Sequence, residues 1–203
     1  MSAFLVATLV TALTDSRQAT GTASTNPVLL PVVVFDYASV PAQWLSWARD
    51  AMSRIYRDIG VEIAWREPQA DARTGVIILI VPETPTIQKG VPDAVIGYSS
   101  GAADDRRRVA YVLYGRLDRF RLEQVPQINR GNMLGALMAH EVGHLLLPVD
   151  SHSSSGLMRA RWNRGELELA QHGRLRFTAD QARLIRAKLS RLAEAGREGQ
   201  VAK

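Results

Sequence analysis

Short runs of Val, Ile and Leu along the chain have the apolar character of buried strands. They are bounded by segments rich in Pro, Gly, Ser and Thr, which is typical of strands separated by loops. The pattern predicts strands at residues 27–35, 61–65, 76–81, 94–99 and 109–114. The run at 76–81 has no polar residue, so we expect it to lie in the centre of the sheet.

Three other segments repeat their apolar positions at the spacing of a helix. The first spans 41–59 and is followed by Gly60, a residue that favours a helix end. The second is the apolar stretch 133–147, with Asn132 as a suitable N-cap and Pro148 unable to continue it. The third begins with the capping-box pattern of residues 178–181 and packs on the core.

These elements predict an α+β fold with a sheet of about five strands. A backing helix, a helix that carries the candidate site, and a C-terminal helix accompany the sheet. The domain is expected to span residues 27–195, and residues 196–203 are expected to be a frayed tail.

The first 23 residues have the features of a secretory signal peptide. An apolar run at 4–13 precedes the small residues Gly21, Thr22 and Ala23, which suit a cleavage site. The apolar run is too short to span a bilayer. We therefore predict a secreted or periplasmic protein. The alternatives are a disordered start or a first strand, in which case the protein would be cytoplasmic.

The composition of the 203 residues narrows the chemistry. There is no cysteine, which excludes disulfides and thiolate metal sites, so any metal ion must be bound by His, Asp, Glu or water. The formal net charge is +5, but the basic residues are dispersed and are not interleaved with aromatic residues. We therefore expect a solvated basic surface and no nucleic-acid partner.

The strongest motif lies in the predicted helix at 133–147, where His140, Glu141 and His144 form the pattern H-E-x-x-H. Histidines four residues apart on a helix project side by side and can bind one zinc ion. Glu141, on the adjoining flank, can act as general base toward a zinc-bound water. The alternative is a chance match in which both histidines are ordinary core residues.

A catalytic zinc ion usually has three protein ligands, so a third ligand is needed. Asp150 and His152 both lie in the loop that follows Pro148, and Glu166 or Glu168 could reach the site from another helix. His172 lies in a polar segment and is predicted to be on the surface.

The stretch from His140 to Met158 resembles the metzincin branch of the zinc metallopeptidases, whose motif continues to a third ligand and a turn bearing a methionine. The resemblance implies a zincin-like fold with a mixed, mostly parallel sheet, one catalytic Zn²⁺, and Met158 as the Met-turn residue. Strict spacing would make Asp150 the third ligand, whereas a turn two residues longer would deliver His152, which we prefer because imidazole is a common zinc ligand. Leu147 replaces the glycine of the family motif.

Two further features follow from this resemblance. The edge strand at 94–99 would pair with a peptide substrate, and Gly97 and Tyr98 would offer their backbone to it. A tyrosine that some metzincins carry two residues after the methionine is Ala160 here, with Trp162 the nearest aromatic residue.

The sequence thus predicts a monomeric zinc endopeptidase that acts on peptides or proteins and has no membrane span. An alternative function is a non-catalytic zincin-like module, for binding or structure, in which zinc is only a staple. A third is a basic surface-binding protein with a chance motif.

Overall fold

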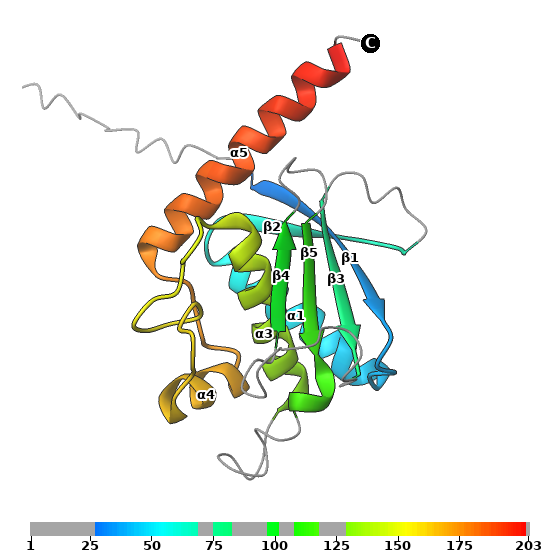
Figure 1. The fold of residues 1–203 in the computed structure, drawn as a ribbon, viewed down its shortest axis with the longest axis vertical. Coiled ribbons are helices and arrows are strands. Elements are labelled where there is room, and N and C mark those ends of the chain that lie inside the picture. The colour runs from blue at the N-terminus through cyan, green and yellow to red at the C-terminus, as the bar shows by residue number, and fades with distance from the viewer. Residues whose placement is uncertain (1–26, 69–74, 83–96, 102–107, 118–128, 202–203) are drawn as a thin grey trace, which may run out of the picture.

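The fold is built on one five-stranded sheet (Figure 1). The computed structural model describes residues 27–68, 75–82, 97–101, 108–117 and 129–201. The strands are β1 (Val28–Asp36), β2 (Val61–Arg66), β3 (Val76–Val81), β4 (Gly97–Gly101) and β5 (Arg108–Leu113), in the spatial order β2-β1-β3-β5-β4. Neighbouring strands are parallel except for β4, which pairs antiparallel with β5 and forms one edge of the sheet.

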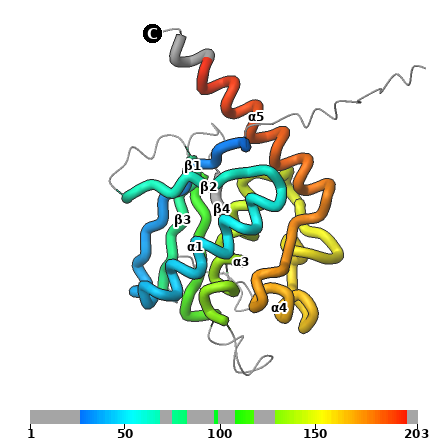
Figure 2. The backbone as a smooth tube through the Cα atoms, turned by 180° about the vertical axis from the view of Figure 1, so that it is seen from behind, coloured from blue at the N-terminus to red at the C-terminus, as the bar shows by residue number. Residues whose placement is uncertain are grey.

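Two helices pack against one face of this sheet, as the opposite views of Figures 1 and 2 show. The helices are α1 (Ala42–Arg57), α3 (Arg130–Leu146), α4 (Arg164–Gln171) and α5 (Ala179–Val201). Helices α1 and α3 cover the sheet, α4 packs against α3, and α5 contacts α3 and β1 and then extends away from the body of the domain.

The core lies between the sheet and the two covering helices. Alternate residues of the central strands point into it, because side chains of a strand alternate between its two faces. Ile78 and Ile80 of β3 are completely buried there together with Leu134 and Met138 of α3. Burying side chains of this size contributes roughly 1.5–3 kcal/mol each, so this layer holds α3 firmly on the sheet.

Helices α1 and α3 approach each other closely because α3 has glycines at the contact. A Cβ atom on Gly135 would lie 2.5 Å from the carbonyl oxygen of Ala48 and 2.7 Å from the Cβ of Ala51. One turn earlier, a Cβ on Gly131 would lie 2.4 Å from the Cβ of Trp47. The absence of side chains at both positions therefore sets the distance between the helices.

The structure confirms the predicted fold class, an α+β protein with a five-stranded, mostly parallel sheet. The central position predicted for the strand at 76–81 is also confirmed. Three other strands lie within one residue of their predicted bounds at each end. In the fifth, β4 begins at Gly97, while residues 94–96 of the predicted strand lie outside the described part of the chain.

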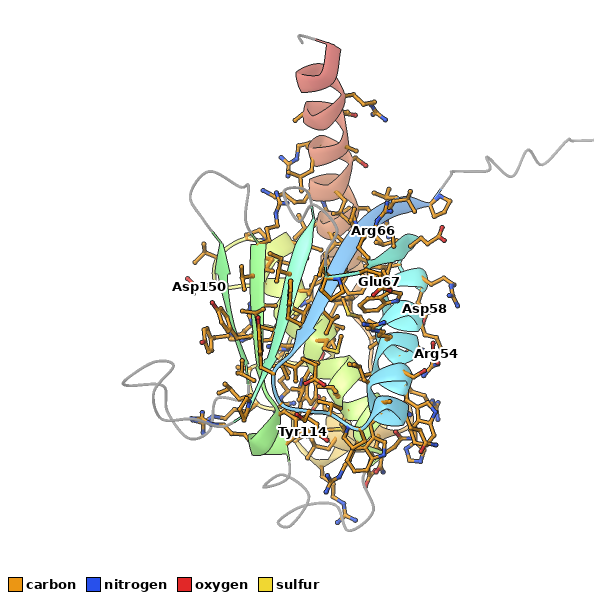
Figure 3. The ribbon with its side chains drawn as sticks, turned by 90° about the vertical axis from the view of Figure 1, so that its right-hand side faces the viewer. Arg54, Asp58, Arg66, Glu67, Tyr114 and Asp150 are labelled. Atoms are coloured by element: carbon orange, nitrogen blue, oxygen red, sulfur yellow. The ribbon has the colours of Figure 1, made fainter. Side chains whose placement is uncertain are left out.

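The predicted start of the motif helix was wrong. The N-cap is Asn129, whose side chain accepts a hydrogen bond from the N–H of Asn132, so α3 begins at Arg130. Asn132 instead donates from its amide to the carbonyl of Gln171 and accepts from Arg54, which links α3 to α4 and α1 (Arg54 is labelled in Figure 3). The first turn of α3 consists of Arg130, Gly131 and Asn132. None of these residues has an apolar side chain, so the apolar spacing did not predict this turn.

The C-terminal part of the chain contains helices α4 and α5. The capping box at Thr178 and Gln181 is present, with each backbone N–H bonded to the other side chain. Helix α5 continues past Ala195 to Val201. Helix α4 was not predicted, although its capping box of Asn163 and Glu166 is a recognisable sequence signal.

The predicted signal peptide, residues 1–23, lies outside the described residues. Among the described helices, none combines the length and the apolar character that crossing a membrane requires.

Gly135→Ala tests the close helix contact. The added methyl group would overlap the backbone of Ala48, and overpacking of this kind costs about 1–3 kcal/mol. We expect a lower midpoint in chemical denaturation by a corresponding amount. Gly196→Ala in α5 is the matched control, because nothing lies within 4 Å of its Cβ position, and helix propensity predicts a gain of up to about 1 kcal/mol. Equal stability of the two variants would contradict the packing argument.

Candidate metal centre

Helix α3 presents His140 and His144 on one face, one turn apart. Their Nε2 atoms lie 3.1 Å from each other, and their ring centroids are 4.8 Å apart. His140 is buried and His144 is half-buried. The two imidazoles therefore turn the same nitrogen toward a shared point, as the four-residue spacing predicts.

The loop after α3 brings a third histidine to the same point. Leu147, directly before Pro148, is extended, with φ −99° and ψ 162°, as residues before proline prefer. The chain then turns through Asp150, whose φ of 61° is left-handed, and reaches His152. Ligand atoms of His140, His144 and His152 all lie within 4.8 Å of one another.

The remaining predicted ligands lie elsewhere. Asp150 is exposed, is not part of this histidine group, and lies at the edge of the molecule in Figure 3. Glu166 bonds to the N–H of Asn163 and forms an ion pair with Arg159 (3.3 Å), and Glu168 pairs with Arg164. The structure thus places His152 beside the motif histidines. Asp150, Glu166 and Glu168 are not part of this group.

His172, the fourth histidine, is exposed, as its polar surroundings predicted. Its Nδ1 lies 2.6 Å from the carbonyl oxygen of Glu168 at the end of α4. It takes no part in the histidine group.

Hydrogen bonds hold the two motif imidazoles by the nitrogens that face away from the shared point. His140 Nδ1 lies 2.7 Å from the carbonyl oxygen of Leu157, which also accepts from Trp162 Nε1 at 3.0 Å. Because a carbonyl only accepts, His140 carries its proton on Nδ1 and leaves Nε2 free as a ligand. His144 Nδ1 lies 3.1 Å from Ser151 Oγ. The roles of Ser151 and Trp162 behind the imidazoles could not be predicted, because the spacing of the metal-binding motif does not include either residue.

Both motif histidines are held in the neutral form. Burial lowers the pKa of His140 from 6.5 to about 4, with a smaller opposing effect from the hydrogen bond to Leu157 and a further lowering by His152. Burial, His140 and His152 lower the pKa of His144 to about 4 as well. Neutral imidazole is the form that binds metal ions, so these rings are ready to bind at neutral pH.

Glu141 lies beside the group, and its side chain is nearly inaccessible to solvent. One carboxylate oxygen, Oε2, is buried and has no hydrogen-bond partner among the residues that the structure describes. Burial raises the pKa of Glu141 from 4.5 to about 8. A buried carboxyl without a partner is costly in an ordinary core, which marks this position as one that serves a ligand.

Gly97 of the edge strand β4 borders this carboxyl group. A Cβ atom there would lie 2.5 Å from Oε1 of Glu141, so the backbone of β4 passes directly against the glutamate. The sequence does not predict this contact, which is possible only because glycine has no side chain at this position.

Met158 lies beneath α3 on a hydrogen-bonded turn. The N–H of Arg159 donates to the carbonyl of Gly156, whose φ is +79°. Met158 is completely buried, and a Cβ atom on Gly143, between the two histidines, would lie 2.6 Å from its sulfur. The methionine thus supports the helix turn that carries the imidazoles, and soft side chains suit such close contacts.

Comparison with known proteins assigns no family to this arrangement. No protein-family model matches the chain, and no curated protein is similar enough in sequence to serve as a relative.

The pKa shifts predict how the stability of the metal-free protein depends on pH. From about pH 4 to 6.5 the unfolded forms of His140 and His144 bind protons that the folded forms do not, so stability rises with pH. From about pH 4.5 to 8 folded Glu141 keeps a proton that its unfolded form loses, which lowers stability as pH rises. Below pH 6.5 the two histidines change the folding stability more than the one carboxyl does, so stability rises with pH. Above pH 6.5 only the carboxyl contributes, so stability falls.

We therefore expect the unfolding temperature, measured in the presence of a chelator as a function of pH, to be highest near pH 6.5. Glu141→Gln should remove the decline above this pH, whereas Glu168→Gln, an exposed carboxyl of α4, should leave the profile unchanged. A decline that persists in Glu141→Gln would show that another group causes it.

Proposed function

We propose that this protein is a zinc-dependent endopeptidase of metzincin-like type. The observation that carries the proposal is the group of three histidines, with ligand atoms within 4.8 Å of one another, beside the buried carboxyl of Glu141, whose Oε2 has no hydrogen-bond partner among the described residues. Three protein ligands with room for a fourth, together with a neighbouring carboxyl, are the pattern of a hydrolytic metal site.

The donor set fits zinc. All three ligands are imidazoles, which suit Zn²⁺, and carboxylate ligands of the kind that calcium and magnesium prefer are absent from the group. His152 is exposed while His140 is buried, so the group is reached by solvent from one side. That geometry favours a catalytic site over an enclosed structural one.

When bound, zinc would supply Lewis-acid chemistry, polarising a peptide carbonyl and lowering the pKa of water. Glu141 would accept the proton of the attacking water and deliver it to the leaving amine. Burial favours the protonated form of Glu141, and beside a bound divalent ion its carboxyl would ionise more readily, as this role requires.

The position of the edge strand β4 favours a peptide as the substrate. It lies at the end of the strand order, and Gly97 contacts the Glu141 carboxyl. A peptide that adds to this edge by strand pairing would therefore run close to the general base. Such binding also follows from the metzincin resemblance, as does a Met-turn role for Met158, supported by its burial under Gly143.

Metal titration tests the ligand set. We expect one zinc ion per chain by elemental analysis. His152→Ala should weaken zinc affinity by more than about 100-fold, because even changes to residues behind the ligands cost 10–100-fold. Asp150→Ala is the matched control in the same loop and should retain the affinity. The opposite ranking would make Asp150 the third ligand.

A peptide-library assay tests catalysis. The zinc-loaded protein should cleave internal peptide bonds and lose this activity with a chelator. Glu141→Gln should keep the metal and lower kcat by about 10²–10⁴-fold, the usual contribution of a general base. Full zinc occupancy without cleavage, together with a large loss of thermal stability on chelation, would favour the alternative, a structural zinc module.

A further inference from the structure

Each motif histidine has a partner on its outward nitrogen, but the two partners differ in kind. His140 is bonded to a backbone carbonyl, that of Leu157, at 2.7 Å. His144 is bonded to a side chain, the hydroxyl of Ser151, at 3.1 Å. The orientation of His144 therefore depends on the identity of one residue.

His144 also needs this partner more than His140 does. The ring of His140 is buried and packs edge-on against Trp162, with centroids 5.9 Å apart. His144 lies one turn further along α3 and is only half-buried. With less packing around its ring, hydrogen bonding has a larger share in fixing its rotamer and the nitrogen that carries the proton.

The loop delivers Ser151 to His144 from two fixed ends. On one side α3 ends at Leu146, and the left-handed Asp150 turns the chain back toward the helix. On the other side the N–H of Ser153 donates to the carbonyl of Met158, and its hydroxyl accepts from Gln181. Ser151, which is half-buried, and the ligand His152 are therefore placed by the same short segment.

The chemistry of a hydroxyl suits this place. When it accepts the Nδ1–H of His144, the lone pair of Nε2 is left free and faces Nε2 of His140 at 3.1 Å. Partners behind a metal ligand fix its tautomer and ring orientation, and their loss usually lowers metal affinity by 10–100-fold.

We propose that Ser151 is a positioning residue that holds His144 in the tautomer and orientation required for metal binding. The inference rests on the metal site of the proposed function and extends it to a residue outside the motif. Ser151 itself contacts neither metal nor substrate and acts through His144.

The test compares three variants of the full chain by zinc competition against a chromophoric chelator. Ser151→Ala should weaken zinc affinity by about 10–100-fold. Ser151→Thr keeps the hydroxyl and should restore most of the affinity. Ser154→Ala, at an exposed serine in the same loop, is the matched control and should bind zinc like the unchanged protein.

Three further measurements separate positioning from loop stability. Nitrogen NMR of the zinc-loaded protein should show His144 protonated at Nδ1, with this signal altered in Ser151→Ala and kept in Ser151→Thr. The visible spectrum of the Co²⁺-loaded protein should change in the same variant only. The unfolding temperature in chelator should be similar for Ser151→Ala and Ser154→Ala.

The outcomes distinguish this inference from the proposed function. Zinc binding and peptide cleavage with unchanged affinity and spectra in Ser151→Ala would overturn the role of Ser151 and leave the peptidase intact. Loss of affinity in Ser151→Ala, rescue by Thr and no cleavage by any form would support Ser151 and overturn the peptidase. Absence of zinc binding in the unchanged protein would overturn both.

Discussion

Helix α3 is buried along most of its length, and its position decides where the motif residues His140, Glu141 and His144 lie. Glycines let the helix come close to its neighbours on two sides: Gly135 meets α1, and Gly143 meets Met158. Packing without voids makes such a helix hard to shift or rotate. The apolar contacts of the same helix therefore fix the backbone positions of His140, Glu141 and His144, and hydrogen bonds orient the two imidazole rings.

This rigidity has an electrostatic cost. The helix places two imidazoles and a carboxyl in a region of low dielectric, where burial favours the neutral form of each. Hydrogen bonds to Leu157 and Ser151 offset the cost of burying the imidazoles. In the described part of the chain, one oxygen of Glu141 has no such partner. A folded protein normally satisfies its buried polar groups. This oxygen lies beside the histidine group, where the proposed metal-dependent hydrolysis would require an available carboxylate.

Much of this arrangement was predictable from periodic signals. The apolar run at 76–81 indicated the central strand, and the spacing of His140 and His144 indicated two convergent rings, because strand and helix geometry relate neighbours directly to sequence. What failed depended on contacts across the fold. Asn129 and Asn132 are both suitable N-cap residues; Asn129 is the cap in the structure, while Asn132 bonds across the fold to Arg54 and Gln171. The backbone angle of Asp150, the hydroxyl of Ser151 and the empty Cβ position of Gly97 likewise leave no periodic trace.

The contact between Gly97 and Glu141 also bears on the edge strand itself. Successive residues of a strand face opposite sides, so a shift of one residue would exchange Gly97 for a neighbour such as Tyr98 on the helix side. Tyr98 stacks on Tyr111 of β5, with ring centroids 4.4 Å apart, on the opposite side of the sheet. No ring would fit against the carboxyl of Glu141. A shift of β4 along β5 would therefore bring a side chain against the Glu141 carboxyl, so this contact favours the observed alignment of the two strands.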